Sequence, residues 1–447
     1  MLICDYHVLL VCLPHQSHIN PTLRLATKLA RAGAQVTFAT TVDGLNNLKN
    51  RPSLPTLSYD SFSEEGAKGK TNYLEEIKRV GSASLKNLLL TKAENGQKIN
   101  FIIYGLALPW VAEVARELHV PSAFFFFQSG ISFSAVYNFF KSNGGLINSK
   151  YDTNSTIKIP GLPLLNYDEL PGYLQPSHAS YSPRPSFIEH IQILEKCPNP
   201  LVLINSSEEL EETSTISIPN HITIFFTGSL VYNDIKKPLV CDIFDDLDRG
   251  KYLQWLDSKP DKSVIYVSFG SIAELHKNQK EELFQGLILS GYSFLLVLRD
   301  HEELIKENYH TLEKDNYLIV KWCSQVEVLN HASIGCFVMH CGWNSIMESV
   351  LSGVPVVGCP QFADQMMNAK MVEQVWGNGV KAVEDGDSDG VVGREETKRC
   401  LMVVMGDEMI KMKCEKLKYI AMKAMGDCGS SSKHLEHLFK YFEDVLA

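Results

Sequence analysis

The sequence has few of the features that mark membrane proteins and nucleic-acid-binding proteins. No apolar run reaches the roughly 18 uncharged positions that a membrane-spanning helix needs. Basic residues are outnumbered, with 42 Lys and Arg against 52 Asp and Glu, so the formal net charge is -10. A protein that binds nucleic acid or an anionic membrane needs a basic face, which this balance does not predict. We therefore expect no nucleic acid and no membrane as a partner.

Signals for secretion and for disulfide bonding are also missing. The amino terminus is apolar from Val8 onward but carries no positively charged start and no small-residue cleavage site. The 11 cysteines are an odd number, scattered from Cys4 to Cys428 without paired spacing, which argues against a disulfide framework. We expect a reduced, cytoplasmic protein.

What the sequence does contain is an alternation of short β-rich runs and amphipathic segments, which is typical of a parallel sheet covered by helices. In the first such unit, we expect a helix that Asn20 caps, that Pro21 opens and that ends near Gly33. Further helices are expected at 110–118, 279–290 and 433–446. Strands are expected at 8–13, 36–40, 100–104, 122–127, 201–204, 222–226, 264–269, 294–298, 318–322, 336–339 and 354–359.

Two segments interrupt this alternation. Residues 143–187 are rich in Pro, Gly, Ser, Asn and Tyr, which predicts long surface connections, and residues 230–248 are polar and acidic. The 447 residues exceed what one compact core accommodates. We therefore expect an α/β protein with two doubly wound domains. They are an amino-terminal domain over 1–235, a linker over 236–250 and a carboxy-terminal domain over 251–429.

The segment 322–365 is the richest in chemistry. A strand at 336–339 is followed by a turn at Gly342, and Asn344 or Ser345 can cap the helix that comes next. A glycine turn that opens a helix is a ready anion site, because backbone N–H groups and the helix dipole both point at the incoming charge. Further donors come from the side chains of His340, Asn344 and Ser345, and together they indicate a diphosphate cradle.

Each of these signals also has a purely structural explanation. The spacing from Ser345 to Glu348 is that of a helix capping box. Trp322, at the end of a strand, is typical of a core residue. The candidate ligands for a zinc ion are Cys323, Cys336, His340 and Cys341. A zinc site is disfavoured, because twelve residues lie between Cys323 and Cys336, whereas His340 and Cys341 are adjacent, and this spacing suits a tetrahedral site poorly.

Taken together, the segment 322–365 resembles the signature box of plant family-1 UDP-dependent glycosyltransferases. The likeness extends to 16–21, 205–211 and 255–271, so it covers almost the whole chain. It implies a GT-B fold, in which two Rossmann-like domains face each other across a cleft and the last helix, over 430–447, packs back on the first domain. It also implies an inverting transfer in plant secondary metabolism, with UDP-glucose as donor substrate and no metal or other cofactor. We expect a monomer.

The resemblance also implies roles at the donor site. Trp322 stacks on uracil, and the backbone of Cys323 pairs with the edge of the base. Gln325 and Glu348 hold the ribose hydroxyls. The phosphates are held at the Gly342 turn by Ser271, His340, Asn344 and Ser345. The sugar is contacted by Trp343, Asp364 and Gln365, and a box that ends in Gln rather than His favours glucose.

His18 is the candidate catalytic base. It follows the first expected strand and precedes a helix amino terminus, which disfavours the imidazolium and keeps a neutral base available near pH 7. In the family this histidine takes the proton from the acceptor, whose oxygen then attacks the anomeric carbon. The family supports the histidine with an aspartate five residues before a tryptophan-like position. Here Trp110 marks that place, and five residues earlier the chain has Gly105.

Three explanations for Gly105 remain open. The acceptor can be acidic enough, as a carboxylic acid or an activated phenol, to need little help from His18. Water or another side chain can fill the space. Or the protein binds the UDP-sugar without turning it over. The main hypothesis is therefore transfer of glucose to a hydroxyl or carboxyl group of a small hydrophobic acceptor, and the alternative is a catalytically weak or inactive UDP-sugar or small-molecule binding protein.

The acceptor side is aromatic. The four phenylalanines at 124–127 are most simply a buried strand, and the residues just past its end are better placed to line a pocket. A pocket with aromatic walls suits a flat, apolar acceptor such as a flavonoid, a simple phenol or an isoprenoid acid. The candidate pocket residues are Gln128, Ser129 and Phe133, with Tyr181 and Phe187 from the loops.

Overall fold

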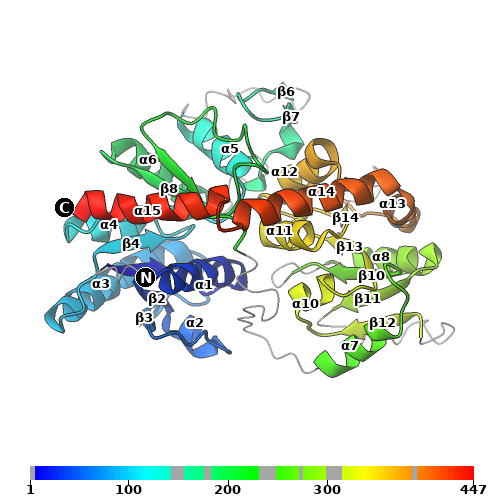
Figure 1. The fold of residues 1–447 in the computed structure, drawn as a ribbon, viewed down its shortest axis with the longest axis horizontal. Helices are drawn as coiled ribbons and strands as arrows, with labels where there is room; N and C mark the ends of the chain where they lie inside the picture. The colour runs from blue at the N-terminus through cyan, green and yellow to red at the C-terminus, as the bar shows by residue number, and fades with distance from the viewer. Residues whose placement is uncertain are drawn as a thin grey trace. The chain divides into compact units, whose positions relative to one another are not determined.

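The computed structural model describes residues 6–141, 156–175, 183–230, 248–270, 275–298, 315–384 and 390–446. The chain divides into two compact units, Met1–Ile243 with Lys423–Ala447, and Phe244–Met422. Each unit contains one parallel sheet with helices packed on it (Figure 1).

The sheet of the first unit has seven strands, all paired in parallel, in the order β3-β2-β1-β4-β5-β8-β9. β4 and β8 are buried along their whole length, as in parallel sheets with both faces covered. Because β1 pairs with β2 on one side and β4 on the other, the strand order reverses at β1, and ligands bind at the carboxyl ends of strands near such a reversal. The strands are β1 His7–Val11, β2 Gln35–Thr41, β3 Leu57–Phe62, β4 Phe101–Tyr104, β5 Ser122–Phe126, β8 Leu201–Ile204 and β9 Thr223–Phe226.

Seven helices belong to the described part of this unit, together with a short antiparallel pair and two 3-10 turns. The last helix, α15, packs on β9, where the Phe226 N–H donates to Nδ1 of His434 at 2.7 Å (Figure 1). The helices are α1 Gln16–Arg31, α2 Val42–Asn47, α3 Tyr73–Glu94, α4 Pro109–Glu117, α5 Gly130–Lys141, α6 Arg184–Lys196 and α15 Ser430–Leu446. The pair is β6 Thr156–Ile157 with β7 Leu165–Asn166, followed by the turns Tyr167–Glu169 and Gly172–Leu174.

The sheet of the second unit has six parallel strands in the order β12-β11-β10-β13-β14-β15, so its strand order reverses at β10. The strands are β10 Val264–Ser268, β11 Ser293–Val297, β12 Tyr317–Val320, β13 Ile334–Met339, β14 Val356–Gly358 and β15 Gly379–Lys381. The helices are α7 Arg249–Asp257, α8 Lys277–Ser290, α10 Gln325–Leu329, α11 Trp343–Ser352, α12 Gln365–Lys370 with a π-helical turn at Met371–Trp376, α13 Arg394–Gly406 and α14 Glu408–Met425, whose last residues belong to the first unit.

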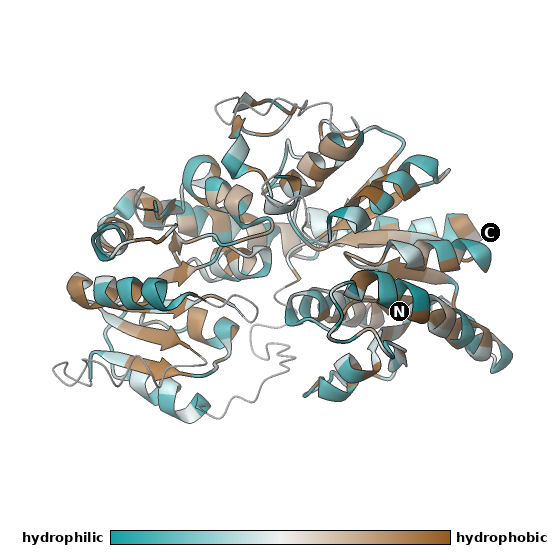
Figure 2. Cartoon of the chain, turned by 180° about the vertical axis from the view of Figure 1, so that it is seen from behind, coloured by the Kyte–Doolittle hydropathy of each residue, from teal (hydrophilic) through white to brown (hydrophobic). Residues whose placement is uncertain are grey.

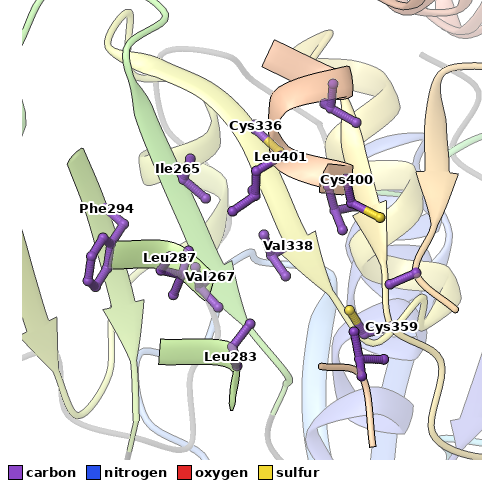
Figure 3. Packing of buried hydrophobic residues seen from close by; sticks show 14 of the residues in the cluster. Ile265, Val267, Leu283, Leu287, Phe294, Cys336, Val338, Cys359, Cys400 and Leu401 are labelled. Atoms are coloured by element: carbon purple, nitrogen blue, oxygen red, sulfur yellow. The ribbon is translucent and has the colours of Figure 1, made fainter. Parts of the chain in front are cut away.

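The core of the second unit lies between its sheet and the helices α8 and α13. Alternate residues of β10 and β13, among them Val267 and Val338, meet apolar residues of both helices (Figure 3). The two helices approach closely because α8 has Gly286 at the contact, where a Cβ would lie 2.5 Å from Cβ of Thr397. Cys336 and Cys400 are part of this core, and burial raises the pKa of both thiols. The nine cysteines in the described part of the chain are all free.

The structure confirms the predicted fold class of two doubly wound α/β units, and many of the strands are hydrophobic along most of their length (Figure 2). The sequence analysis did not predict the strands β3 and β15, the short pair β6 and β7, the long helix α3, or the helices α2, α5, α6, α7, α10, α12, α13 and α14. The predicted linker lies outside the described residues up to 247, and its last two residues already belong to α7. The predicted irregular stretch contains little regular structure where it is described, but α6 begins inside it at Arg184. Within the described ranges, no helix is both long and apolar enough to span a bilayer.

Candidate functional site

In the second unit, the loops that follow β10 and β13 meet at His340. A Cβ at Gly270 would lie 2.9 Å from Cε1 of His340, and a Cβ at Gly342 would lie 2.5 Å from its Nε2. Neither contact is allowed, so these two glycines provide the space for the imidazole. Gly270 also has a φ of +77°, which favours glycine. Within the described part of the chain, Nδ1 of His340 is buried without a hydrogen-bond partner, and burial lowers the pKa of the ring to about 4, so it is neutral at pH 7.

Helix α11 begins one residue after Gly342, which is its N-cap residue. The prediction that Asn344 or Ser345 caps this helix is wrong, because both lie inside its first turn. The tight turn is made by Cys341, whose φ is +62°, and its side chain is packed against Gly358, where a Cβ would lie 2.6 Å from Sγ. Among the described residues no side chain caps α11, and the N-cap residue, Gly342, has no side chain to compete with an anion at this helix terminus.

Gln325 joins α10 to α11. Its Nε2 donates to Oγ of Ser345 at 2.9 Å and to Oε2 of Glu348 at 2.7 Å, while its Oε1 accepts from the hydroxyl of Tyr266 at 3.3 Å. The capping-box explanation of Ser345 and Glu348 is therefore wrong, because Ser345 is not an N-cap residue and Glu348 binds a side chain of another helix. The carboxylate of Glu348, the amide of Gln325 and the hydroxyl of Ser345 are thus brought together.

Trp322 and Cys323 lie between β12 and α10, beside this cluster. Trp322 is half-buried, and Cys323 is buried with its Sγ 3.5 Å from the hydroxyl of Tyr266. Cys336, the next candidate in the disfavoured zinc set, belongs to the core on β13. Among the described residues, no three His, Cys, Asp or Glu side chains are grouped as metal ligands.

Asp364 and Gln365 lie at the start of α12, where Asp364 is the N-cap residue and Gln365 the first helical residue. Oδ2 of Asp364 accepts from Nδ2 of Asn368 at 2.8 Å, and burial raises the pKa of this carboxyl to about 6. Oε1 of Gln365 accepts the backbone N–H groups of Gln361 at 2.8 Å and Phe362 at 3.0 Å. Gln365 therefore presents only its amide nitrogen to a ligand.

In the first unit, His18 lies within helix α1 and not in a loop before it. The helix begins at Gln16, because the extended backbone of His15 lets its carbonyl accept the N–H groups of His18 at 2.9 Å and Ile19 at 2.8 Å. The predicted cap at Asn20 is therefore wrong, and Pro21 lies inside the helix. Gly33, with a φ of 107°, follows the end of the helix as predicted. His18 is still in the first turn, where the helix dipole disfavours a positive charge.

The half-buried ring of His18 lies among aromatic groups. Its centroid is 4.7 Å from that of Phe127 and 5.6 Å from that of His15, both in edge-on arrangements. Nδ1 is buried, and no donor or acceptor in the described ranges is bonded to it. Burial, with a smaller effect of His15, lowers the pKa of His18 to about 3, so the neutral base predicted from the sequence is the form that this environment favours.

Gly105 directly follows β4, and its N–H donates to the carbonyl of Val11 at 3.0 Å. Its φ is not positive, and a Cβ there would meet Cε1 of Phe127 at 3.5 Å and Cβ of Cys12 at 3.9 Å, which are ordinary contact distances. The backbone therefore does not require glycine at this position.

The candidate acceptor residues fall into different surroundings. Phe133 and Ser129 have no exposed surface, since Phe133 packs on Phe126 and Ser129 donates to Ser132. Gln128 accepts from the hydroxyl of Tyr173 at 3.0 Å. Phe187 is buried and stacks on Tyr173. The last acceptor candidate, Tyr181, lies outside the described residues, and so does the donor candidate Ser271.

Three residues of this arrangement did not emerge from the sequence as site residues. Tyr266 holds Gln325 from a neighbouring strand, and only the sheet order places it there. Asn368 holds Asp364, and the spacing of four residues at a helix start is a signal that could have found it. Phe127 was interpreted only as part of a buried strand.

Comparisons with known proteins agree with this geometry. The family described as UDP-glucoronosyl and UDP-glucosyl transferase matches residues 207–420. Mogroside I-E synthase from Siraitia grosvenorii is 38% identical over 94% of this chain and 92% of its own length. Crocetin glucosyltransferase, chloroplastic, from Gardenia jasminoides is 38% identical over 96% of each chain. The structure of Os79 from O. sativa in complex with UDP has a TM-score of 0.84 and 28% identity, and the match covers 98% of this chain and 100% of that one.

Two Rossmann-like units with this order of strands define the GT-B class of transferases, as predicted. The chain belongs to the plant family-1 UDP-dependent glycosyltransferases, and is thus an enzyme that transfers sugar from a UDP-sugar to small molecules.

Proposed function

We propose that this enzyme transfers glucose from UDP-glucose to a hydroxyl or carboxyl group of a small hydrophobic aromatic or isoprenoid acceptor, with inversion at the anomeric carbon and without a metal ion. The observation that carries the proposal is the cluster in which Gln325 binds both Ser345 and Glu348 beside the turn at His340. Similarity to the crocetin glucosyltransferase of Gardenia jasminoides supports glucose and a small acceptor. A cytoplasmic location and a monomer remain predictions.

For the donor, the proposal gives each group a role that its chemistry suits. Glu348 accepts hydrogen bonds from ribose hydroxyls, and Gln325 orients that carboxylate. The diphosphate lies at the uncapped start of α11, where neutral His340 donates one N–H. Trp322 stacks on uracil, and the sugar hydroxyls meet Asp364 and the amide nitrogen of Gln365. Ser271 and Asn344 are proposed to add phosphate contacts, Trp343 a sugar contact and Cys323 a backbone contact to the base.

For the chemistry, we propose that neutral His18 accepts the proton of the acceptor. The acceptor oxygen forms a bond to the anomeric carbon of glucose, the bond from that carbon to the β-phosphate oxygen breaks, and UDP leaves with the electron pair. Attack from the face opposite UDP inverts the configuration. The low pKa of His18 supplies the neutral form but makes it a weak base.

The test is turnover by the full chain with UDP-glucose and a mixed panel of phenols and carboxylic acids, measured as released UDP and as product mass. On a phenol, His18→Ala should lower kcat by about 10²–10⁴-fold, the usual contribution of a positioned base. Undiminished turnover by His18→Ala would refute the base.

The second candidate is a binding protein without turnover. It is favoured by the glycine at 105 and by Nδ1 of His18, which has no hydrogen-bond partner among the residues that the structure describes. Both candidates bind UDP, so calorimetric UDP binding without any product from the panel would select it. A competing series with UDP-galactose and UDP-xylose tests the preference for glucose.

A further inference from the structure

Phe127 contacts both His18 and the backbone of Gly105, the position at which the family has an aspartate that supports the base. Its ring centroid lies 4.7 Å from that of His18, and its Cε1 lies 3.5 Å from where a Cβ of residue 105 would be. One apolar ring thus meets the base on one side and the bare backbone of Gly105 on the other. Phe127 is itself buried, with 5% of its surface exposed.

The position of Phe127 is fixed by its neighbours. Nδ2 of Asn205, a buried residue at the end of β8, donates to the carbonyl oxygen of Phe127 at 3.3 Å. Oδ1 of the same Asn205 accepts the N–H of Leu230 at 3.2 Å. The ring of Phe125 packs on that of Phe127, with centroids 5.9 Å apart. The amide of Asn205 therefore holds the strand end from which the ring projects toward His18.

This packing has a chemical consequence for His18. A protonated imidazole has two N–H donors, and a buried donor without an acceptor costs free energy. In a histidine base supported by a carboxylate, the carboxylate fixes the tautomer and stabilises the imidazolium that forms during the reaction. Here Nδ1 is buried without a partner in the described ranges and a phenyl ring lies against the imidazole, so proton transfer to His18 leaves its charge unsupported.

We propose that Phe127 is a positioning residue for His18, that it occupies the place of a supporting carboxylate, and that it thereby restricts turnover to acceptors whose oxygen ionises readily. This inference rests on the proposed function and extends it to the acceptor class. A carboxylate oxygen is ionised at neutral pH and has no proton to give up, and an acidic phenol loses its proton easily. An aliphatic alcohol needs a stronger base than this environment provides.

The test replaces the ring and the glycine separately and together. The variants are Gly105→Asp, Phe127→Leu, and the double variant Gly105→Asp with Phe127→Ala. Each is assayed for kcat and KM on the best carboxylic acid acceptor and on the alcohol of the same skeleton. We expect Gly105→Asp alone to gain nothing on the alcohol, because the Phe127 ring, which packs on both His18 and position 105, is still in place. The double variant should gain at least about tenfold in kcat on the alcohol.

A matched control is the double variant Gly105→Asp with Phe126→Ala. Phe126, the last residue of β5, directly precedes Phe127 and is also buried, but its ring packs on that of Phe133. It should show no gain on the alcohol. A gain by Gly105→Asp alone equal to that of the double variant, or no gain by a folded double variant, would overturn the role of Phe127.

If the alanine variant does not fold, Gly105→Asp with Phe127→Leu takes its place. NMR titration of the His18 ring gives a second readout that needs no turnover. The pKa should stay low in the native chain and in Gly105→Asp, and rise only when the ring is also removed. A rise in Gly105→Asp alone would again overturn the inference. If the native chain binds UDP but converts no acceptor, the proposed function fails, and the titration still decides whether Phe127 separates the two positions.

Discussion

Gly270 and His340 are matched in shape, because the imidazole occupies the place where a side chain at 270 would be. The match allows the loop after β10 and the loop after β13 to meet at the point of strand reversal. The positive φ of Gly270 adds a second reason for glycine there.

The first prediction follows from this match. Gly270→Ala should displace the His340 ring, since the new Cβ would lie 2.9 Å from Cε1, and it should strain the backbone. We expect the dissociation constant for UDP to rise at least about tenfold, which is about 1.4 kcal/mol. Isothermal titration calorimetry measures it. Gly406→Ala is the control, because a Cβ there meets nothing within 4 Å. An unchanged affinity in Gly270→Ala would contradict the role of His340 at the phosphates.

The second prediction concerns Gln325. Gln325→Glu loses both donated hydrogen bonds and places a second carboxylate beside Glu348, 2.7 Å from the present amide nitrogen. Like charges at that distance repel, so Glu348 can no longer be held for the ribose. KM for UDP-glucose should rise about 10- to 100-fold, from the lost charge-assisted bond to Glu348 and the lost neutral bond to Ser345, with a smaller effect on kcat. Gln374→Glu adds the same charge at an exposed position of the same unit and should change neither constant. If both substitutions raised KM equally, the added negative charge alone would explain the effect, and the hydrogen bonds of Gln325 would have no specific role.

The third prediction is a pH dependence of donor binding. The pKa of Asp364 is raised to about 6 by burial, so its carboxylate is charged above pH 6 and protonated below it. If Asp364 accepts hydrogen bonds from the sugar, KM for UDP-glucose is low above pH 6 and rises as the pH falls through 6. Asp364→Asn should raise KM about tenfold at pH 8 and abolish that change with pH. Binding of UDP, which lacks the sugar, serves as the internal reference, and the same pH change in UDP affinity would contradict the assignment.

The strands that the sequence predicted well are those buried on both faces. The run at 201–204 is continuously apolar because β8 lies inside the sheet, and nothing but its own composition was needed to find it. β3, at 57–62, was missed because it is an edge strand of the sheet and mixes polar with apolar residues. The start of α1 was misplaced for another reason. The turn closes on the backbone carbonyl of His15 without a side-chain cap, so Asn20 was the better local signal although it is not used.

The candidate site divides in the same way. The residues from Trp322 to Gln365 were found because they are close in sequence, and their chemistry is visible in the order of the chain. The contact of Phe127 with His18 depends on the pairing of β1, β4 and β5, which brings residues 18, 105 and 127 to one edge of the sheet. No local pattern contains that register, so Gly105 could be recognised as a departure but the ring beside it could not.

The last prediction concerns His190, whose ring stacks on Phe124 at a centroid distance of 4.0 Å and lies parallel to Tyr104 at 5.8 Å. Both ring nitrogens are buried without a partner in the described ranges, and burial lowers the pKa of the ring to about 3. An unfolded histidine takes up a proton near pH 6.5 while the folded one does not, so the folded state loses up to about 1.4 kcal/mol for each pH unit below that value.

His190→Phe should remove this loss, because phenylalanine keeps the stacking and does not titrate. Between pH 7.5 and pH 5, the native chain should lose about 2 kcal/mol more of its free energy of unfolding than the variant does. Urea unfolding followed by circular dichroism at both values measures the difference. His119→Asn is the matched control, since His119 is exposed in the same unit and its φ of 55° suits asparagine. The control should retain the full native pH dependence, and an equal dependence in His190→Phe would show that the acid sensitivity arises at other buried groups, such as His18 and His340.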